Sequence, residues 1–193
     1  SLPKETNNFD LATVSDVILH LKYTARDGGD LLREQAREAV LNVARKGVRM
    51  IAVRNELPDA WHHFRHPSGT GGTQELKLAL TQTLFPFFAR GQPITVQRVK
   101  LMASCDPDVG DRLTARLSLG ADEESVEIAL TRQVGDPAYG NLHHGEAPST
   151  EEVASWPIGD WAIRLGTVET GAFRSLAAEK VGDLFVVLYF TTG

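Results

Sequence analysis

The sequence has a single cysteine and no long apolar run. Cys105 is the only thiol among 193 residues, so the chain cannot form an internal disulfide. The longest apolar stretch, near the C-terminus, is far shorter than the ~20 residues that a membrane-spanning helix needs. A chain of this length can bury a sizeable core without disulfides or metals. We therefore predict one domain over residues 1–193 that makes no membrane contact of its own.

Positive charge is also scarce. The chain has 20 Lys and Arg against 25 Asp and Glu, which gives a net charge of −5 and a pI of about 5.7. A general nucleic-acid-binding protein would show a basic face, so we expect no nucleic-acid partner. Hydrophobic residues make up 42% and charged residues 23%, values that are ordinary for a soluble globular protein.

The histidines around Trp61 do not form a known metal motif. His62 and His66 have the spacing of two metal ligands on a helix, but His63 stands where a metalloprotease helix would need Glu. Pro58 and Pro67 leave little room for a helix, so the sequence predicts a turn here, with one helical turn at most. We expect a surface or interface cluster, with Trp61 and Phe64 as core anchors.

Catalytic motifs are missing elsewhere too. The "SGTGGT" of residues 68–73 lacks the Lys-Ser/Thr of a phosphate-binding loop, and no G-x-S-x-G elbow occurs. The acids in residues 122–124 and 151–152 lie in polar turn segments, where solvated charge is usual. His143 is expected in an exposed loop, and Cys105 as a small buried or half-buried thiol with no base to pair with it. We predict a protein that is not an enzyme and holds no metal or cofactor.

Segments with alternating apolar and polar residues dominate the chain, as in strands with one wet face. About eight such strands, separated by turn signals every 8–20 residues or so, favour a sandwich or barrel over βαβ units. We predict a mostly β fold: an antiparallel two-sheet β-sandwich of jelly-roll type, with a long loop at residues 134–148. The predicted strands are residues 17–23, 48–55, 74–80, 94–104, 112–119, 125–133, 159–166 and 181–191.

One amphipathic helix is predicted directly after the first strand. Asp30 is placed at its N-cap, and Gly47 ends it, with Arg45 and Lys46 in the last turn. Its apolar face is formed by Leu31, Leu32, Ala36, Ala39, Val40 and Val43.

Two segments at opposite ends of the chain are near-copies of one another. They are "VSDVILHLKYT" at residues 14–24 and "VGDLFVVLYFT" at residues 181–191. Both are more apolar than the strands between them, which indicates burial on both faces. Asp16 and Asp183 are expected to cap a turn before each strand. We predict that the copies lie side by side and antiparallel; the alternative is a chance resemblance.

Three phenylalanines surround Pro86 in residues 84–94, "LFPFFARGQPI". One interpretation is that they close one end of the sandwich. The other is a partner surface, because clustered aromatic residues favour interfaces. The candidate partner-binding residues are Phe85, Phe87, Phe88 and Arg90.

The run "FDLATVSDVILHLKYTARDGG" at residues 9–29, followed by the predicted helix, resembles the C-terminal region of the A subunits of insecticidal toxin complexes, the Tc toxins. Three further pieces fit the pattern of that family in the same order, and together the four cover nearly the whole chain. They are "NELPDAWHHFRHP" at residues 55–67, "LFPFFARGQPITVQRVKLM" at residues 84–102 and "VGDLFVVLYFTT" at residues 181–192.

In that family the secreted A subunit is a homopentamer that binds host cells and forms an injection channel. Its C-terminal domain binds the B subunit, whose β-propeller gates a cocoon that holds the toxic enzyme. The resemblance therefore implies a non-catalytic module of a bacterial virulence factor that binds the Tc B subunit (TcB). A Trp-containing, strand-forming stretch precedes "LPKE" in the family, and the first residue here is Ser1. We thus expect a fragment of a larger chain, with the completeness of one edge strand left open.

A second hypothesis is a carbohydrate-binding β-sandwich for recognition of the host-cell surface, because jelly-roll modules of this size often bind glycans. Such a site would be a shallow groove lined with exposed aromatic and amide or acid side chains. The candidate platform residues are Trp61, Trp156 and Trp161, although Trp161 in "DWAIRL" is also a core candidate.

Overall fold

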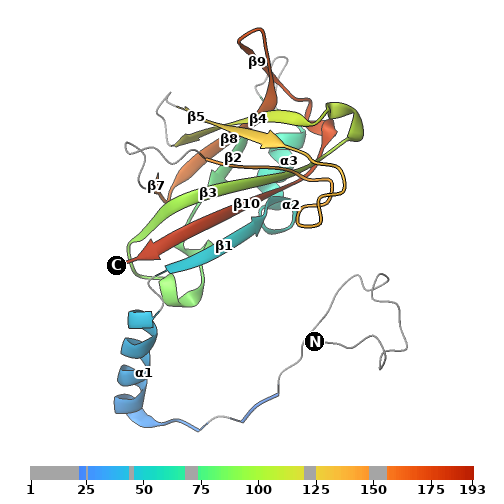
Figure 1. The fold of residues 1–193 in the computed structure, drawn as a ribbon. Coiled ribbons are helices and arrows are strands. Elements are labelled where there is room, and N and C mark those ends of the chain that lie inside the picture. Colours follow the sequence, from blue (N-terminus) through green and yellow to red (C-terminus); the bar gives the residue numbers. More distant parts are fainter. Residues whose placement is uncertain (1–21, 25, 44–45, 68–73, 120–124, 148–155) are drawn as a thin grey trace, which may run out of the picture. The chain divides into compact units, whose positions relative to one another are not determined.

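The fold comes from a computed structural model that describes residues 22–24, 26–43, 46–67, 74–119, 125–147 and 156–193 (Figure 1). The chain divides into two compact units, Ser1–Arg37 and Glu38–Gly193. Within the described ranges, no helix is both long enough and apolar enough to cross a bilayer.

The predicted helix is confirmed as α1, Gly29–Val43. Its predicted end is wrong, because Lys46 and Gly47 belong to the strand β1, Lys46–Ala52, and not to the last turn of the helix. Its first turn is organised differently from the prediction. The carboxylate of Asp27 accepts a hydrogen bond from the Gly29 N–H at 2.9 Å, which satisfies one of the amides left free at a helix start. Asp30 lies inside the first turn and pairs with Arg33 at 2.8 Å. Asp27 therefore takes the capping role that the sequence assigned to Asp30.

The larger unit is built on one antiparallel sheet of ten strands, so the mostly β prediction is confirmed. The strand order is β1-β10-β3-β6-β5-β4-β8-β2, with β7 beside β3 and β9 beside β8. Figure 1 shows that the sheet curls. The strands are β1 Lys46–Ala52, β2 Leu76–Ala79, β3 Ile94–Cys105, β4 Arg112–Leu119, β5 Ser125–Thr131, β6 His143–Glu146, β7 Trp156–Pro157, β8 Asp160–Glu169, β9 Ala172–Ser175 and β10 Val181–Thr192.

The C-terminal near-copy, β10, is a central strand, as its apolar sequence indicated. Val186, Val187 and Leu188 are consecutive buried residues. Its neighbours are β1 and β3, which occupy both of its edges along residues 185–191. The predicted pairing of β10 with the N-terminal near-copy is therefore wrong. Most of residues 14–24 lie outside the described residues, and Lys22–Thr24, which is described, is not a strand.

The core lies on the concave side of the curl. Alternate residues of the neighbouring strands point inward, so side chains from both ends of the sheet join one buried cluster. Each large apolar side chain buried there stabilises the fold by about 1.5–3 kcal/mol. The members from β1, β3 and β10 are Ile51, Val99, Leu101, Leu188 and Phe190. The members from β2, β4 and β8 are Leu78, Leu117, Ile163 and Leu165.

Two short helices follow β1 and help to cover the core: α2, Val53–Glu56, and α3, Pro58–Arg65. The predicted turn at α3 was wrong, because Pro58 starts this eight-residue helix rather than preventing it. A proline is tolerated in the first helical turn, where its missing N–H has no partner to lose. Phe64 is buried as predicted, with 2% of its surface exposed, and Trp61 packs against the cluster from a half-buried position.

The long loop predicted at residues 134–148 contains β6, which pairs with β3 and β5. His143 on this strand is fully buried, and its Nε2–H donates to the Gly110 carbonyl at 2.8 Å. The prediction that His143 lies in an exposed loop is therefore wrong. Four short 3₁₀ helices complete the described connections: η3 Gln82–Leu84, η4 Phe87–Ala89, η5 Pro107–Val109 and η6 Ala178–Lys180.

Candidate functional site

The connection from β2 to β3, residues 81–93, is called here the Phe87 loop. Phe85 points into the protein, is 1% exposed, and meets the ring of Phe190 edge to face with centroids 5.0 Å apart. This is a favourable aromatic geometry. Phe85 therefore belongs to the buried core. It cannot touch a partner in the folded protein, so its assignment as a partner-binding residue is wrong.

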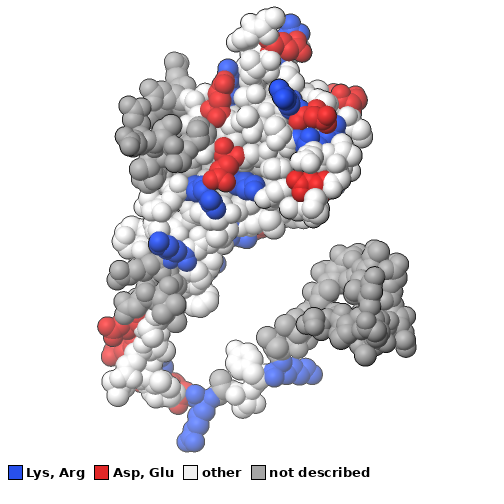
Figure 2. All heavy atoms as spheres, in the orientation of Figure 1, with Lys and Arg blue, Asp and Glu red and all other residues white. Residues whose placement is uncertain are grey.

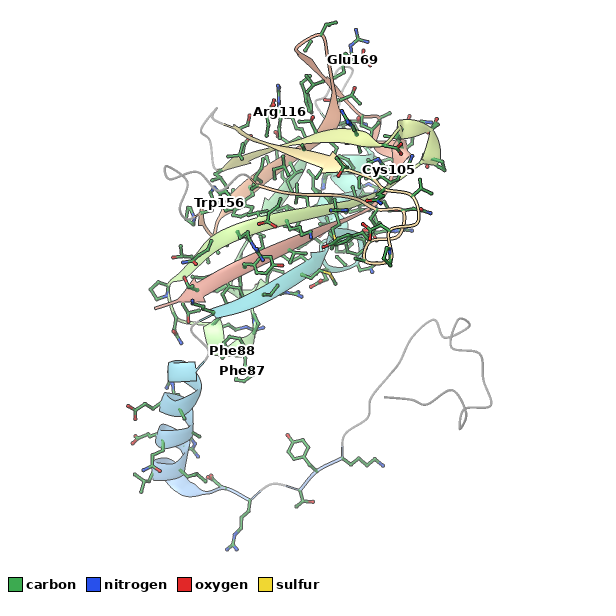
Figure 3. All side chains as sticks on the ribbon, in the orientation of Figure 1. Phe87, Phe88, Cys105, Arg116, Trp156 and Glu169 are labelled. Carbon is green, nitrogen blue, oxygen red and sulfur yellow. The ribbon has the colours of Figure 1, made fainter. Side chains whose placement is uncertain are left out.

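Phe87, two residues later, points the other way. Its side chain is 77% exposed, whereas Phe88 is half-buried against the core, and the two rings meet at 80° with centroids 5.8 Å apart. Figure 3 shows both in the lobe beside β1. An exposed Phe side chain contributes little burial free energy to the folded state. Its large apolar area is of the kind that anchors protein interfaces.

Two glutamines tie the ends of the Phe87 loop together. The side-chain amide of Gln82 donates to the Gln92 carbonyl at 3.2 Å and accepts from the Gly91 N–H at 2.9 Å. Gln92 in turn donates from its side chain to the Phe88 carbonyl at 3.1 Å. The loop is thus a closed turn held by hydrogen bonds, with Phe87 on its outside. Because the loop is already ordered, binding a partner through Phe87 would cost little conformational entropy.

Arg90 spans the base of the same loop. Its Nε–H donates to the Phe85 carbonyl at 3.2 Å, and Nη2 donates to the Thr83 carbonyl at 3.1 Å. Arg90 is nevertheless exposed, so its charge remains available at the surface. Its partner-binding role stays a prediction, beside a structural role that the sequence did not reveal.

Arg49 on β1 fixes the loop to the sheet. Its Nε–H donates to the Leu84 carbonyl at 2.6 Å, and its guanidinium pairs with Glu56. Glu56 also accepts the Ala52 N–H at 3.0 Å, which joins β1 to α2. The position of Phe87 is therefore set by the sheet itself.

The histidine cluster lies on α3. The rings of His62 and His66 stack with centroids 4.6 Å apart, and His66 Nδ1 lies 3.1 Å from the His62 carbonyl. Over the described ranges, no three His, Cys, Asp or Glu side chains gather as ligands for a metal ion.

The three tryptophans do not form an exposed platform. Trp156 and Trp161 are each 2% exposed and pack edge to face, 6.4 Å apart between ring centroids. Trp161 donates its indole N–H to the Pro157 carbonyl at 3.1 Å. Trp61 packs on Phe64 with centroids 5.5 Å apart.

Cys105 at the end of β3 is half-buried, as predicted. Burial raises the pKa of its thiol from 9.0 to about 11; Arg132 opposes this shift and Asp106 adds to it. Between pH 9 and 11 the unfolded thiol is largely ionised while the folded one is not, so the unfolded state binds fewer protons there. Stability should therefore fall as the pH rises through this range.

The same shift predicts slow thiol chemistry. At pH 8, alkylation of folded Cys105 by iodoacetamide should be at least tenfold slower than in the urea-unfolded chain, because the thiolate is the reacting species. In the Cys105→Ala variant, the unfolding free energy should fall less steeply between pH 9 and 11 than in the wild type. Equal alkylation rates in the folded and unfolded chains would contradict the assignment.

The exposed candidate site therefore consists of Phe87, the edge of Phe88 and Arg90, on a loop fixed to β1. A scan against models of protein families and a search of curated proteins found no match to the chain.

Proposed function

We propose that the chain is the docking module of a Tc toxin A subunit and binds the B subunit, at the β-propeller of the B–C cocoon, during assembly of the secreted holotoxin. The observation that carries this proposal is Phe87, an exposed aromatic side chain on a hydrogen-bonded loop. The identity of the partner comes from the resemblance of residues 9–29, 55–67, 84–102 and 181–192 to that family. The module itself does no chemistry.

A fixed aromatic side chain is the usual centre of a binding hot spot. Such residues bury a large apolar area, lose few rotamers on binding, and are enriched in interfaces together with arginine. Phe87 and Arg90 lie three residues apart on the Phe87 loop and fit this pairing.

The finer architecture we propose is a two-sheet sandwich of jelly-roll type, with β1, β10 and β3 in one layer and β2, β8 and β4 in the other. Its support is the shared core, in which Leu188 of β10 and Ile163 of β8 belong to one buried cluster. In this arrangement the Phe87 loop closes one end of the sandwich.

Replacing Phe87 by alanine should weaken cocoon binding by a factor of roughly 30, the effect of losing a hot-spot residue worth about 2 kcal/mol. The matched control is Val134→Ala, which truncates another exposed apolar side chain, 75% exposed, in the β5–β6 connection. Its affinity should equal that of the wild type. Biolayer interferometry with the chain immobilised measures both, and equal losses in the two variants would count against the Phe87 loop.

The proposal is tested by titrating the isolated chain with purified B–C cocoon, with a glycan array as control. We expect saturable but weak binding, near micromolar, because the avidity of several neighbouring copies in the full A subunit is lost. A glycan hit without cocoon binding would favour the carbohydrate-binding alternative, for which the shielded tryptophans offer no platform. Silence in both would overturn the docking function of the isolated chain.

A further inference from the structure

The convex face of β1, β10 and β3 carries side chains in rows across the strands. The strand register puts Val48 opposite Tyr189, and Tyr189 opposite Arg98. The next row of this kind is Met50, Val187 and Lys100. Residues opposite one another point to the same side of a sheet, so these two rows share one face.

Along β1 this face differs from the inner one in exposure. Val48 is 57% and Met50 50% exposed, whereas Ile51, the next residue of β1 and on the inner face, is fully buried. On β10 the face is closed in, because Val187 is only 8% exposed. Beta1 is the last strand at its end of the sheet. Natural proteins usually protect an edge strand with charge or proline, and exposed apolar residues on such a strand mark a contact surface.

Cations line the apolar part of the face. The Arg98 guanidinium lies 3.7 Å from the centroid of the Tyr189 ring, and Lys100 Nζ lies 4.2 Å from that of Tyr139. These cation–π contacts orient the positive groups. Arg98 also pairs with Glu146 at 3.4 Å, and the strand register puts Glu146 opposite Lys100 on the same face, so part of the positive charge is offset. Lys46, two residues before Val48, lies on the same face by strand alternation and is exposed. In Figure 2 the surface over β1 and β10 is largely uncharged, with charged groups around it.

We propose that this convex face is a second part of the docking surface and fits a partner surface with acidic groups around an apolar centre. The inference rests on the proposed function and specifies the chemistry of the B-subunit surface. Lys46, Arg98 and Lys100 outweigh Glu146 on this face of a chain of net charge −5, and such a face favours acidic partners. Met, Tyr and Arg, which form it, are the residues enriched in interface centres.

The Phe87 loop is fixed to the same edge strand, because Arg49 of β1 binds the Leu84 carbonyl of that loop. By itself the face is small. Three strands over the seven residues of β1 cover about 350 Å², less than half of the roughly 800 Å² that each partner buries in a standard interface. The face and the loop together offer a larger contact area than the face alone, and several copies would add avidity.

Two matched pairs of variants test the inference in the cocoon titration. Met50→Thr keeps a strand-compatible side chain and should raise Kd about fivefold or more. Its control, Val168→Thr, alters a 46% exposed residue on β8 and should leave Kd unchanged. Lys46→Glu should slow association at low salt and flatten its salt dependence. Its control is Lys77→Glu, at an exposed position on β2, the strand at the other end of the sheet.

The outcomes separate the two proposals. If Met50→Thr and Lys46→Glu bind like the wild type while Phe87→Ala does not, the convex face is overturned and the docking function stands. Absence of cocoon binding by the wild type overturns both. Thermal melting of each variant identifies any that has lost its fold, and Met50→Ala then replaces Met50→Thr.

Discussion

The Phe85→Ala variant is expected to lose about 3–5 kcal/mol of unfolding free energy, the range for removing a buried phenylalanine from a core. The ring is 1% exposed and lies against Phe190 of β10, the central strand. Its removal would leave a cavity at the end of the core and free the base of the Phe87 loop. Urea unfolding followed by circular dichroism measures the loss, since the midpoint falls at constant slope.

Phe87→Ala is the natural control, two residues away in the same loop. Because Phe87 is 77% exposed, its truncation should change the unfolding free energy by no more than about 0.5 kcal/mol. The Phe85→Ala variant should thus lose stability, whereas the Phe87→Ala variant should keep its stability and lose binding affinity. Equal destabilisation by both variants would contradict the burial of Phe85 and the exposure of Phe87.

Gly145→Ala is expected to be the second severe variant. A Cβ at this position on β6 would lie 2.0 Å from the backbone carbonyl oxygen of Ala129 on β5. A backbone atom cannot rotate away, so β5 and β6 would have to separate. We expect a loss of about 3 kcal/mol or more, at the upper end of the cost of overpacking.

Gly182→Ala is the matched control, because Gly182 is also a strand glycine. Its added Cβ would meet nothing closer than 3.6 Å, an ordinary contact with Ser104. Its melting temperature should stay within a few degrees of that of the wild type. If the Gly145→Ala variant melted at the same temperature as the Gly182→Ala variant, the close approach of β5 and β6 would be contradicted.

The strands that the sequence predicted well are those with one wet and one buried face. The predicted range 112–119 is identical to β4, and the strand predicted at 94–104 differs from β3 by one residue. Their alternation follows directly from the two-residue period of a strand. Beta6, with the sequence HHGE, has no such alternation, and its buried His143 depends on a hydrogen bond from Nε2 to the carbonyl of distant Gly110.

The partners of each strand were harder to predict. The similarity between residues 14–24 and β10 suggested a pairing, but pairing is decided by register and by available edges, and β10 pairs with β1 and β3. The sequence does not predict the helix α3, because a proline such as Pro58 can either prevent a helix or start one. Local sequence does not distinguish these cases.

The candidate site was located but not resolved by sequence. Residues 84–94 stood out because three phenylalanines cluster there, yet composition cannot say which of them points inward. The fold divides them: Phe85 is buried against Phe190, and Phe87 lies at the surface. The supporting residue Arg49 lies 35 positions before Leu84, whose carbonyl it binds, and no local pattern indicates that contact.

The most direct test of the docking function is amide hydrogen exchange of the chain with and without the B–C cocoon. We predict that the complex protects the amides of the Phe87 loop, residues 81–93, and of β1. The β8–β9 hairpin at the far part of the sheet should exchange as in the free chain. Protection confined to that hairpin, or no protection under conditions where the cocoon is bound, would contradict docking through the Phe87 loop.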